Sequence, residues 1–472
     1  MVPEISAAPA ILLLNLVCVF LIVRSHRFEW ELKLRRNFGV DRHWWLPIIA
    51  LFIGLIFSIV DVSSIQTAFI EKSDIIALIF SFGIMAEGLR ASNFFQHLAY
   101  RLVERMDGDT AKLIGSMFIL TSIATFFTSN DIVVYVFTPI IVSICFQAGI
   151  NNTKLILLSQ FVAANTLSIG MLIGSPTNII VGEAVGLDFF SYLFLMLVPA
   201  LFAFGISYLV LKTVIKLVKT DHIAFMPDLK FEEEYQIPEE NPAQVFTDQM
   251  RDWILIFGFF VFLVAIVTYL NYSLFYCAIP AILISMTYWH FSNRHKSSLR
   301  KPLSNLPYGI FFFGMTFFIF AEQFSRTGFV NTELIPFLQN FFQASTSKTA
   351  LASVFGSGIM VNMFLDLPSS AIISQILPLL ELSTVKEIIL TQGLLIGLNI
   401  GTYVTSIGAL AGLIWFEEIR LQKRHESLNT EDMVFPERKD LIRYGTLNFV
   451  ITGLAASVFL VIEAIVLMQA GF

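Results

Sequence analysis

A polar segment, Thr128–Asp131, interrupts a stretch that is predominantly apolar from Leu113 to Cys145. Crossing a bilayer takes about 20 mostly apolar residues, and neither flank of the interruption reaches that length. The segment therefore predicts a re-entrant hairpin over 111–147, which enters the membrane and returns. Polar groups survive at membrane depth only where protein or a water-filled cavity covers them. We therefore expect the tip residues Ser129, Asn130 and Asp131 to line a site.

The composition supports residence in a membrane. Of the 472 residues, 56% are hydrophobic and 14% are charged, and the mean hydropathy is +0.75. These values are typical of an all-α polytopic membrane protein. The formal net charge of −6 gives no reason to expect a nucleic-acid partner. Three separate cysteines supply neither a disulfide framework nor a metal site, so we expect no metal centre and no cofactor other than a bound Na⁺.

Basic residues gather in alternate loops between the apolar runs, and loops of this kind stay in the cytoplasm. One orientation then fits the whole chain, with ten full crossings, two hairpins and both termini outside a cell membrane, which is expected to be a bacterial inner membrane. The first run, Ala7–Val23, is expected to be a retained span because no small-residue cleavage site follows it. A short outer loop over 61–74 is expected to separate the spans Trp44–Val60 and Ile75–Leu89.

Two later apolar runs contain helix-breaking residues. Gly174–Asn178 lies within a run over 154–186, and Gly401–Gly408 lies within a run over 387–418. Proline cannot donate to the helical hydrogen-bond ladder and glycine disfavours it. Each run is therefore predicted to be a broken helix with polar residues at the break.

The two halves of the chain resemble each other. Three polar landmarks recur at a nearly constant spacing: Glu322 lies 235 residues after Glu87, Asp366 lies 235 residues after Asp131, and Asn399–Gly408 matches Asn165–Gly174 at 234 residues. Equivalent helices run in opposite directions through the membrane in the orientation given above. An inverted repeat with polar interruptions at equivalent places indicates a secondary transporter with its site near the bilayer midplane.

The domain organisation follows from these features. We expect N-terminal scaffold helices over 1–74, a first repeat over 75–219, a cytoplasmic linker over 220–251, a scaffold helix pair over 252–306, a second repeat over 307–440 with its own hairpin over 350–381, and a C-terminal helix over 441–472.

Four stretches resemble the ion transporter superfamily, specifically its arsenite permease and NhaD-type Na⁺/H⁺ antiporter group. They are TSNDIVVYVFTPII (Thr128–Ile141), GSPTNIIVGEAVGLDFF (Gly174–Phe190), FFFGMTFFIFAEQFSRTGF (Phe311–Phe329) and NIGTYVTSIGALAGLIW (Asn399–Trp415). The resemblance implies a transport domain that holds both hairpins and both broken helices and moves, as an elevator, against a scaffold that carries a homodimer contact. The second tip departs from the permease pattern, because Leu365 and Asp366 stand where two amides are usual. Neither tip has the Ser-Asn-Thr of the dicarboxylate branch.

The candidate site residues are the polar and glycine residues at these interruptions. For binding substrate or ion they are Ser129, Asn130, Asp131, Gly174, Ser175, Thr177, Asn178, Asp366, Ser369, Asn399, Thr402, Thr405, Ser406 and Gly408. Asp131 and Asp366 are the leading candidates for the coupling ion, because a carboxylate in low dielectric holds a proton or requires a cation. Glu87, Glu322 and Asn165 have either a coupling or a structural role; Arg90 and Arg326 follow the two glutamates closely enough to pair with them.

These residues predict a secondary active transporter that moves a small inorganic solute by H⁺- or Na⁺-coupled alternating access. Efflux of arsenite or antimonite is the first choice, by resemblance. Na⁺/H⁺ antiport and Na⁺-coupled transport of a small anion such as a dicarboxylate or sulfate stay open. A membrane enzyme or assembly factor is the alternative of a different class, and it is disfavoured because the chain has no nucleophile motif such as G-x-S-x-G.

Overall fold

A computed structural model describes residues 9–11, 13, 45–220, 246–292, 308–406, 408–423 and 433–471, and for 45–47, 308–313 and 410 it describes the backbone alone. The expected first span Ala7–Val23 and the linker over 220–251 lie largely outside these residues. Within them the chain is helical, and its one β-type contact is an isolated bridge between Asn152 and Val434. The prediction of an all-α polytopic protein is confirmed.

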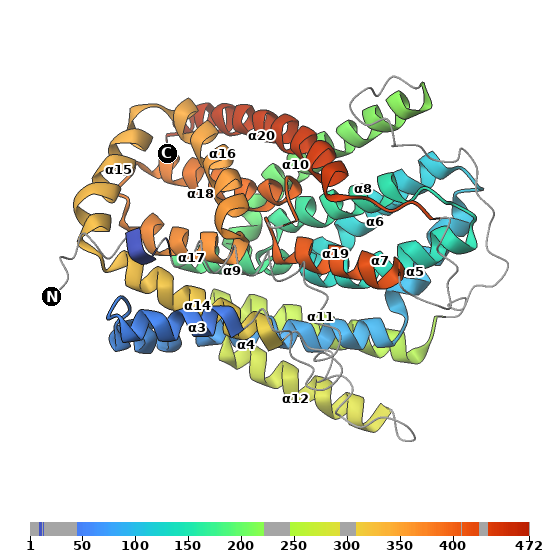
Figure 1. Cartoon of the computed structure of the whole chain (residues 1–472), viewed down its shortest axis with the longest axis horizontal. Coiled ribbons are helices and arrows are strands. Elements are labelled where there is room, and N and C mark those ends of the chain that lie inside the picture. The colour runs from blue at the N-terminus through green and yellow to red at the C-terminus, as the bar shows by residue number, and fades with distance from the viewer. Residues whose placement is uncertain are drawn as a thin grey trace.

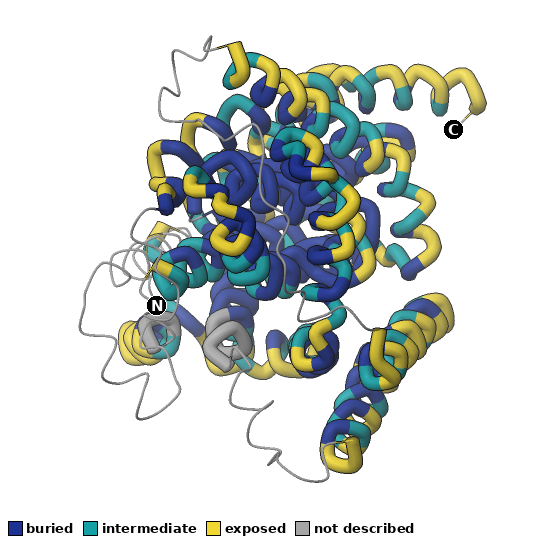
Figure 2. The backbone as a smooth tube through the Cα atoms, turned by 90° about the vertical axis from the view of Figure 1, so that its right-hand side faces the viewer, coloured by how far each residue is buried: buried dark blue, intermediate teal, exposed yellow. Residues whose placement is uncertain are grey.

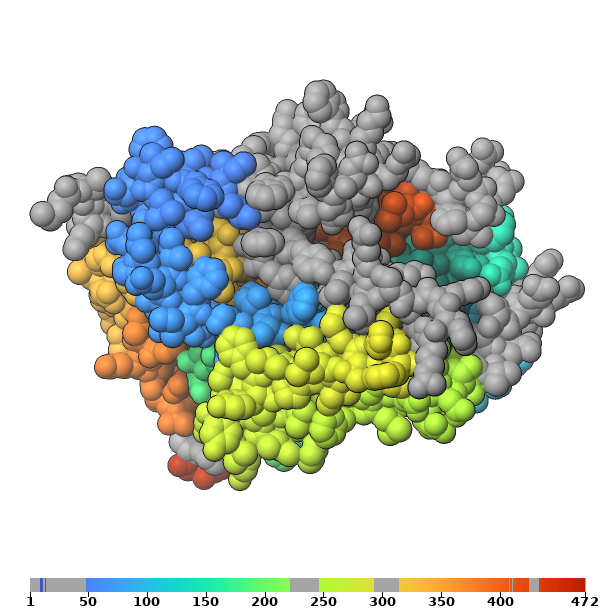
Figure 3. Space-filling view, turned by 90° about the horizontal axis from the view of Figure 1, so that it is seen from below, coloured from blue at the N-terminus to red at the C-terminus, as the bar shows by residue number. Residues whose placement is uncertain are grey.

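The helices form two layers (Figure 1). The lower layer contains α3 (Trp45–Ile56), α4 (Val62–Ala91), α11 (Asp248–Tyr269), α12 (Phe275–Ser292) and α14 (Tyr308–Ser325). Within it, α4 packs against each of the other helices except α3, which packs against α14. Seen from below, α11 and α12 cover the surface beside α3 and α4 (Figure 3). The lower layer therefore combines the expected scaffold segments with the first helix of each repeat.

The loop expected over 61–74 is wrong. Residues 62–91 form one continuous helix, α4, of 30 residues, because this segment has no proline and its polar residues find partners in the protein. Ser64 is fully buried, and its hydroxyl donates to Gln323 Oε1 at 2.8 Å. At its end α4 bends by 52° into α5 (Phe94–Arg105).

The first repeat continues in the upper layer. Its hairpin consists of α6 (Thr110–Phe127) and α7 (Asn130–Gln147), and its broken helix of α8 (Lys154–Thr166), η3 (Leu167–Gly170), η4 (Leu172–Gly174) and α9 (Pro176–Ala184), followed by α10 (Phe189–Lys219). Each hairpin arm has 18 residues, which is about 27 Å of helix. The expectation that the arms are too short to cross a membrane is therefore wrong. The hairpin assignment depends instead on the buried polar tip between them.

The second repeat has the same sequence of elements. After η5 (Val330–Leu334) and α15 (Ile335–Ala344) come the hairpin of α16 (Thr346–Phe364), α17 (Asp366–Ile376) and η6 (Leu377–Leu379), the broken helix of α18 (Thr384–Ile400), η7 (Gly401–Tyr403) and α19 (Leu410–Lys423), and finally α20 (Arg438–Gln469). The second break begins at Gly401 as predicted, whereas the first begins at Leu167, seven residues before Gly174.

The two repeats interlock in the upper layer. The first hairpin arm of each repeat packs on the first part of its own broken helix, α6 on α8 and α16 on α18. The second arm crosses to the other repeat, so that α7 packs against α19 and α17 against α9. Each hairpin tip therefore lies beside the helix break of the other repeat.

The distribution of apolar side chains fits a lipid environment. Five described helices are long and apolar enough to cross a membrane, namely α6, α7, α10, α11 and α20, and α4 with α5 passes the same test as one bent span. Large apolar side chains such as Phe194 and Val458 face outward, while the buried residues gather at the centre of the upper layer (Figure 2). Buried hydroxyl and amide side chains concentrate there too, as expected where lipid replaces water outside.

A buried ion pair joins the two repeats at one end of the upper layer. Lys154, at the start of α8, lies 3.1 Å from Asp440 at the start of α20, and both side chains are less than a tenth exposed. Next to this pair the backbone N–H of Thr153 donates to Val434 O at 2.9 Å.

Replacing Lys154 with Met should lower the free energy of unfolding by about 3–5 kcal/mol, because the Asp440 charge would be left buried without its partner. The combined change Lys154→Met with Asp440→Asn should lose less. Thermal unfolding of the purified protein measures both. Lys112→Met is the matched control, since its pair with Asp109 is exposed and should contribute less than about 1 kcal/mol. Equal losses for Lys112→Met and Lys154→Met would contradict the assignment.

Candidate functional site

The site is built from four helix starts. At the tips, α7 begins at Asn130 and α17 at Asp366; at the breaks, α9 begins at Pro176 and α19 at Leu410. The first N–H groups of a helix have no partner within it and carry partial positive charge. The four helix starts can therefore each donate hydrogen bonds to oxygen atoms, either of the protein or of a substrate.

The two tip carboxylates come from different repeats and approach each other. Asp131 and Asp366 are close enough to interact electrostatically. Asp131 accepts a hydrogen bond from the backbone N–H of Ala411, in the first turn of α19. Its Oδ1 is enclosed and has no hydrogen-bond partner. Asp366 is 4% exposed, and its Oδ1 accepts the backbone N–H of Leu367 at 2.9 Å.

Four buried asparagines surround these interruptions in two pairs. The Asn130 amide donates to Asn165 Oδ1 at 2.8 Å within the first repeat. The Asn399 amide donates to Asn178 Oδ1 at 3.0 Å and so joins the two repeats. Asn165 and Asn399 occupy equivalent positions but have non-equivalent partners, because Leu365 stands at the position equivalent to Asn130.

Side-chain amides also satisfy the backbone at both breaks. Asn178 donates to the carbonyl oxygens of Ser168 and Met171, at 2.8 and 3.0 Å. Asn362, on α16, donates to Gly401 O at 2.7 Å and accepts from Thr405 Oγ1 at 2.6 Å. Sequence reasoning missed Asn362 and Ser168. Asn362 could have been found from the sequence, because it is a polar residue in an apolar run only four positions before Asp366.

The hydroxyl candidates are buried or half-buried and mostly bonded nearby. Ser175 and Thr177 pair through their hydroxyls at 2.9 Å. Thr402 donates to Asn399 O at 2.5 Å, and Ser369 to Leu365 O at 2.6 Å. Thr405 donates to Asn362 as described above, and Ser129 and Ser406 are 7% and 8% exposed.

The glycines at the breaks permit close backbone contacts. A Cβ on Gly174 would lie 2.2 Å from Ser168 O, and one on Gly401 would lie 2.4 Å from Gly358 Cα. One on Gly408 would meet Thr402 Cα at 3.0 Å. These positions fold the breaks tightly, so their role in the structure is to bring polar groups together.

The second tip contains a strained residue. Leu365 has φ 72° and ψ 163°, a region that is otherwise almost restricted to glycine. It connects α16 directly to α17 and is 1% exposed. Strain of this kind persists only where the surrounding packing imposes it, and it concentrates at functional sites.

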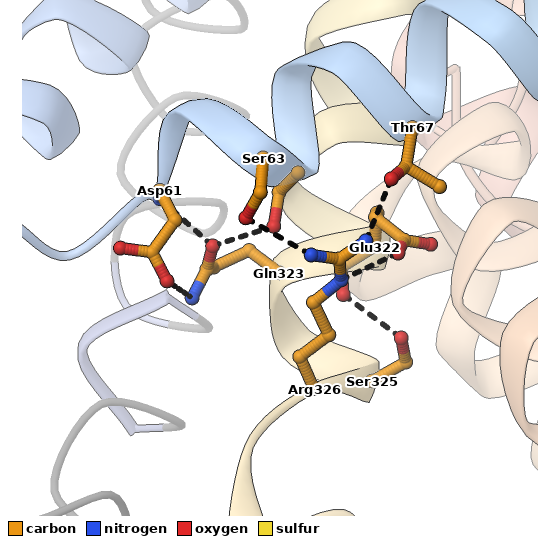
Figure 4. A network of polar contacts seen from close by, with 8 residues as sticks. Asp61, Ser63, Thr67, Glu322, Gln323, Ser325 and Arg326 are labelled. Carbon is orange, nitrogen blue, oxygen red and sulfur yellow. Dashed lines mark hydrogen bonds and ion pairs between the residues drawn. The ribbon is translucent and has the colours of Figure 1, made fainter.

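The structure gives Glu87 and Glu322 cationic partners. Arg90 Nε donates to Glu87 Oε2 at 2.7 Å, and Arg326 Nε donates to Glu322 Oε1 at 2.7 Å. Arg326 also reaches the start of α4, donating to Ser63 Oγ at 3.0 Å and to Thr67 Oγ1 at 2.7 Å (Figure 4). The end of α14 therefore lies beside the start of α4, so these equivalent helices are antiparallel. Their pairing favours a structural role for both glutamates.

Helix α4 also contacts the upper layer through two cations. Lys72 lies 3.9 Å from Glu183 on α9, and the Arg90 guanidinium lies 5.7 Å from the centre of the Tyr135 ring on α7. The two residues are five helical turns apart, so they share one face of α4 at a separation of about 27 Å. Among the described residues, no three His, Cys, Asp or Glu side chains gather as a metal site would require.

The chain is similar to known membrane transport proteins. The family model CitMHS, described as "Citrate transporter", matches residues 42–391. A Bacillus subtilis protein named "Putative arsenical pump membrane protein" is 27% identical over 365 residues, which cover 73% of this chain and 78% of the relative. The "Arsenical pump membrane protein" of Escherichia coli is 24% identical over 344 residues, covering 69% and 74%.

The Asn178–Asn399 bond between the repeats can be measured by a double-mutant cycle. Asn178→Ala and Asn399→Ala should each lower the thermal unfolding midpoint, and the double variant should lose less than the sum. The expected coupling is about 1 kcal/mol, typical of a buried hydrogen bond. Thr213→Ala on the exposed side of α10 should be additive with Asn399→Ala. Additivity of the two asparagine changes would show that the bond contributes nothing.

Proposed function

The chain belongs to the citrate transporter family CitMHS, and on this premise we propose that it exports arsenite or antimonite by secondary active transport, coupled to a cation held between Asp131 and Asp366. The protein is a multi-pass membrane transporter; the substrate and the coupling are the proposal. The observation that carries it is the meeting of one carboxylate from each repeat, at the ends of interrupted helices.

The electrostatics of the site favour a bound cation. Two carboxylates near each other in a medium of low dielectric cannot both stay charged without a counter-charge. Asp366 is the charged group that acts on Asp131, and no lysine or arginine of the described residues does so. A proton or a Na⁺ would remove the repulsion, and its release to one side would leave the site charged again.

The neutral polar groups suit a hydroxylated metalloid. Arsenite is an uncharged trihydroxide at neutral pH, so it needs hydrogen-bond donors and acceptors and no counter-charge. Asn130, Asn399 and the hydroxyls of Ser129 and Thr405 supply both kinds of group. The names of the two relatives support the same substrate class.

Na⁺/H⁺ antiport is the second candidate, favoured by the unpartnered Oδ1 of Asp131 and the nearby Asp366 carboxylate. A carboxylate oxygen without a donor is a ligand that Na⁺ can use as well as a proton. The family name suggests citrate, which is a polycarboxylate. Asp131 and Asp366 would repel it, so citrate would have to enter together with cations. The four helix starts are the feature that favours an anion.

Alternating access would require the upper layer to move against the lower one. The contacts of α4 with α7 and α9, made by Arg90 and Lys72, would then have to separate and form again. We propose a homodimer in the cell membrane, with the scaffold helices providing the contact.

The test is uptake into proteoliposomes, with arsenite, antimonite, Na⁺, citrate, a dicarboxylate and sulfate offered under imposed H⁺ or Na⁺ gradients. Gradient-driven transport of arsenite or antimonite should fall about tenfold or more in Asp131→Asn and in Asp366→Asn, because the coupling charge is lost. Asp107→Asn, at an exposed turn, is the matched control and should transport normally.

Each outcome has a definite meaning. Transport of Na⁺ alone would replace the metalloid by Na⁺/H⁺ antiport, and transport of an anion alone would replace it by anion uptake. Transport that is indifferent to both gradients and both substitutions would overturn the coupling itself.

A further inference from the structure

Another acidic residue, whose hydrogen-bond partner is an amide, lies away from the tips and breaks. Glu463 is on α20, and its Oε1 accepts a hydrogen bond from Gln392 Nε2, on α18, at 3.0 Å. The same amide nitrogen donates to Leu195 O, on α10, also at 3.0 Å. Sequence reasoning did not identify Glu463, because it lies in an unbroken apolar helix with no motif around it.

The three groups lie at one depth. Leu195 is six residues after the start of α10, Gln392 is eight residues after the start of α18, and Glu463 is six residues before the end of α20. At 1.5 Å per residue these positions are about 9–12 Å from their helix ends. An ionisable side chain at such a position in a membrane protein is by default a candidate for function.

Two buried oxygens in this cluster have no donor. Gln392 is fully buried, and its Oε1 has no hydrogen-bond partner. The Oε2 of Glu463 is also enclosed and also has no hydrogen-bond partner. A buried acceptor without a donor is costly, and native proteins rarely leave two together. Both amide hydrogens of Gln392 are already used, so the side chain cannot correct this by turning over.

We propose that Glu463 and Gln392 form a proton-binding site. A proton on Glu463 Oε2 would be donated to Gln392 Oε1, while Gln392 Nε2 donates to Glu463 Oε1. The carboxylic acid and the amide would then share two hydrogen bonds in one planar ring. One proton would satisfy both orphaned oxygens and remove the negative charge.

The surroundings of the pair favour a proton over a metal cation. A Na⁺ or K⁺ needs more oxygen ligands than one carboxylate and one amide supply, and Leu195 O is already an acceptor. No other side chain acts on Glu463 by hydrogen bonding or charge among the described residues. None of the titratable residues on the elements packed against α20 acts on Glu463. They are Lys154, Tyr192, Tyr208, Lys212, Lys216, Lys219, Lys348, Lys386, Glu387 and Tyr403.

Helix α18 connects this pair to the polar interruptions. Gln392 and Asn399 are seven residues apart on α18, which is about two turns and nearly the same face of the helix. Loss of the proton would place a charge beside Gln392 and disturb the packing of α18 on α20. The proton site is thereby positioned to influence the Asn399–Asn178 bond, although its existence does not depend on the proposed transport function.

Infrared difference spectra between low and high pH test the site directly, on the full-length protein in lipid nanodiscs. The wild-type protein should show a protonated carboxyl band that disappears as the pH rises, and Glu463→Gln should lack it. Gln392→Leu should keep the band but move its titration midpoint by about one pH unit or more, because a hydrogen-bond partner of the acid is lost. Glu333→Gln, at an exposed position, should leave the Glu463 band and its titration midpoint unchanged.

Three results would overturn the proposal: a Glu463→Gln spectrum identical to that of the wild type, an unchanged midpoint in Gln392→Leu, or displacement of the band by Na⁺ at constant pH. Thermal unfolding identifies variants that do not fold, and Gln392→Leu alone decides the matter if Glu463→Gln is one of them. Because the readout is proton binding, failure of the arsenite proposal would not affect it.

Discussion

Inside a membrane the protein itself must satisfy every polar group, since no water is available to do so. This constraint explains the polar residues at the centre of the upper layer. Each break in a helix frees backbone groups, and a side chain of this chain meets them: Asn178 at the first break, Asn362 at the second, and Asp131 at the start of α19. The residues that make the site polar are therefore also those that allow the helices to break.

The same constraint separates the acidic residues into two classes. Glu87, Glu322 and Asp440 each have a basic partner, at short range and in fixed geometry. Asp131 interacts with the carboxylate of Asp366, and Glu463 accepts from the amide of Gln392; neither has a basic partner among the described residues, and each has a carboxylate oxygen without a donor. The paired acids stabilise local structure and, at Asp440, join two helices, whereas acids that lack a cation are suited to binding one. Both of our functional proposals follow from this division.

Several features could be predicted from local sequence alone. The second break follows from Gly401, and the restart of the first broken helix follows from Pro176 at the first position of α9; these residues act on the backbone within one helical turn. The pairs Glu87–Arg90 and Glu322–Arg326 follow from the spacing of neighbours on a helix surface. The predictions failed where the deciding partner was distant. The sequence predicts a loop over 61–74, but Gln323 of α14 and Arg326, just after its end, bind polar side chains at the start of this segment.

The sequence by itself determined that the chain is an all-helical membrane protein, where its helices are interrupted, and which polar residues stand at the interruptions. These depend on hydropathy and on backbone preferences, which act over short stretches of chain. Only the tertiary structure decided that α7 crosses to α19 and α17 to α9, that Asp131 meets Asp366, and that Glu463 pairs with Gln392. Those contacts join residues far apart in the chain, and the packing of whole helices brings them together.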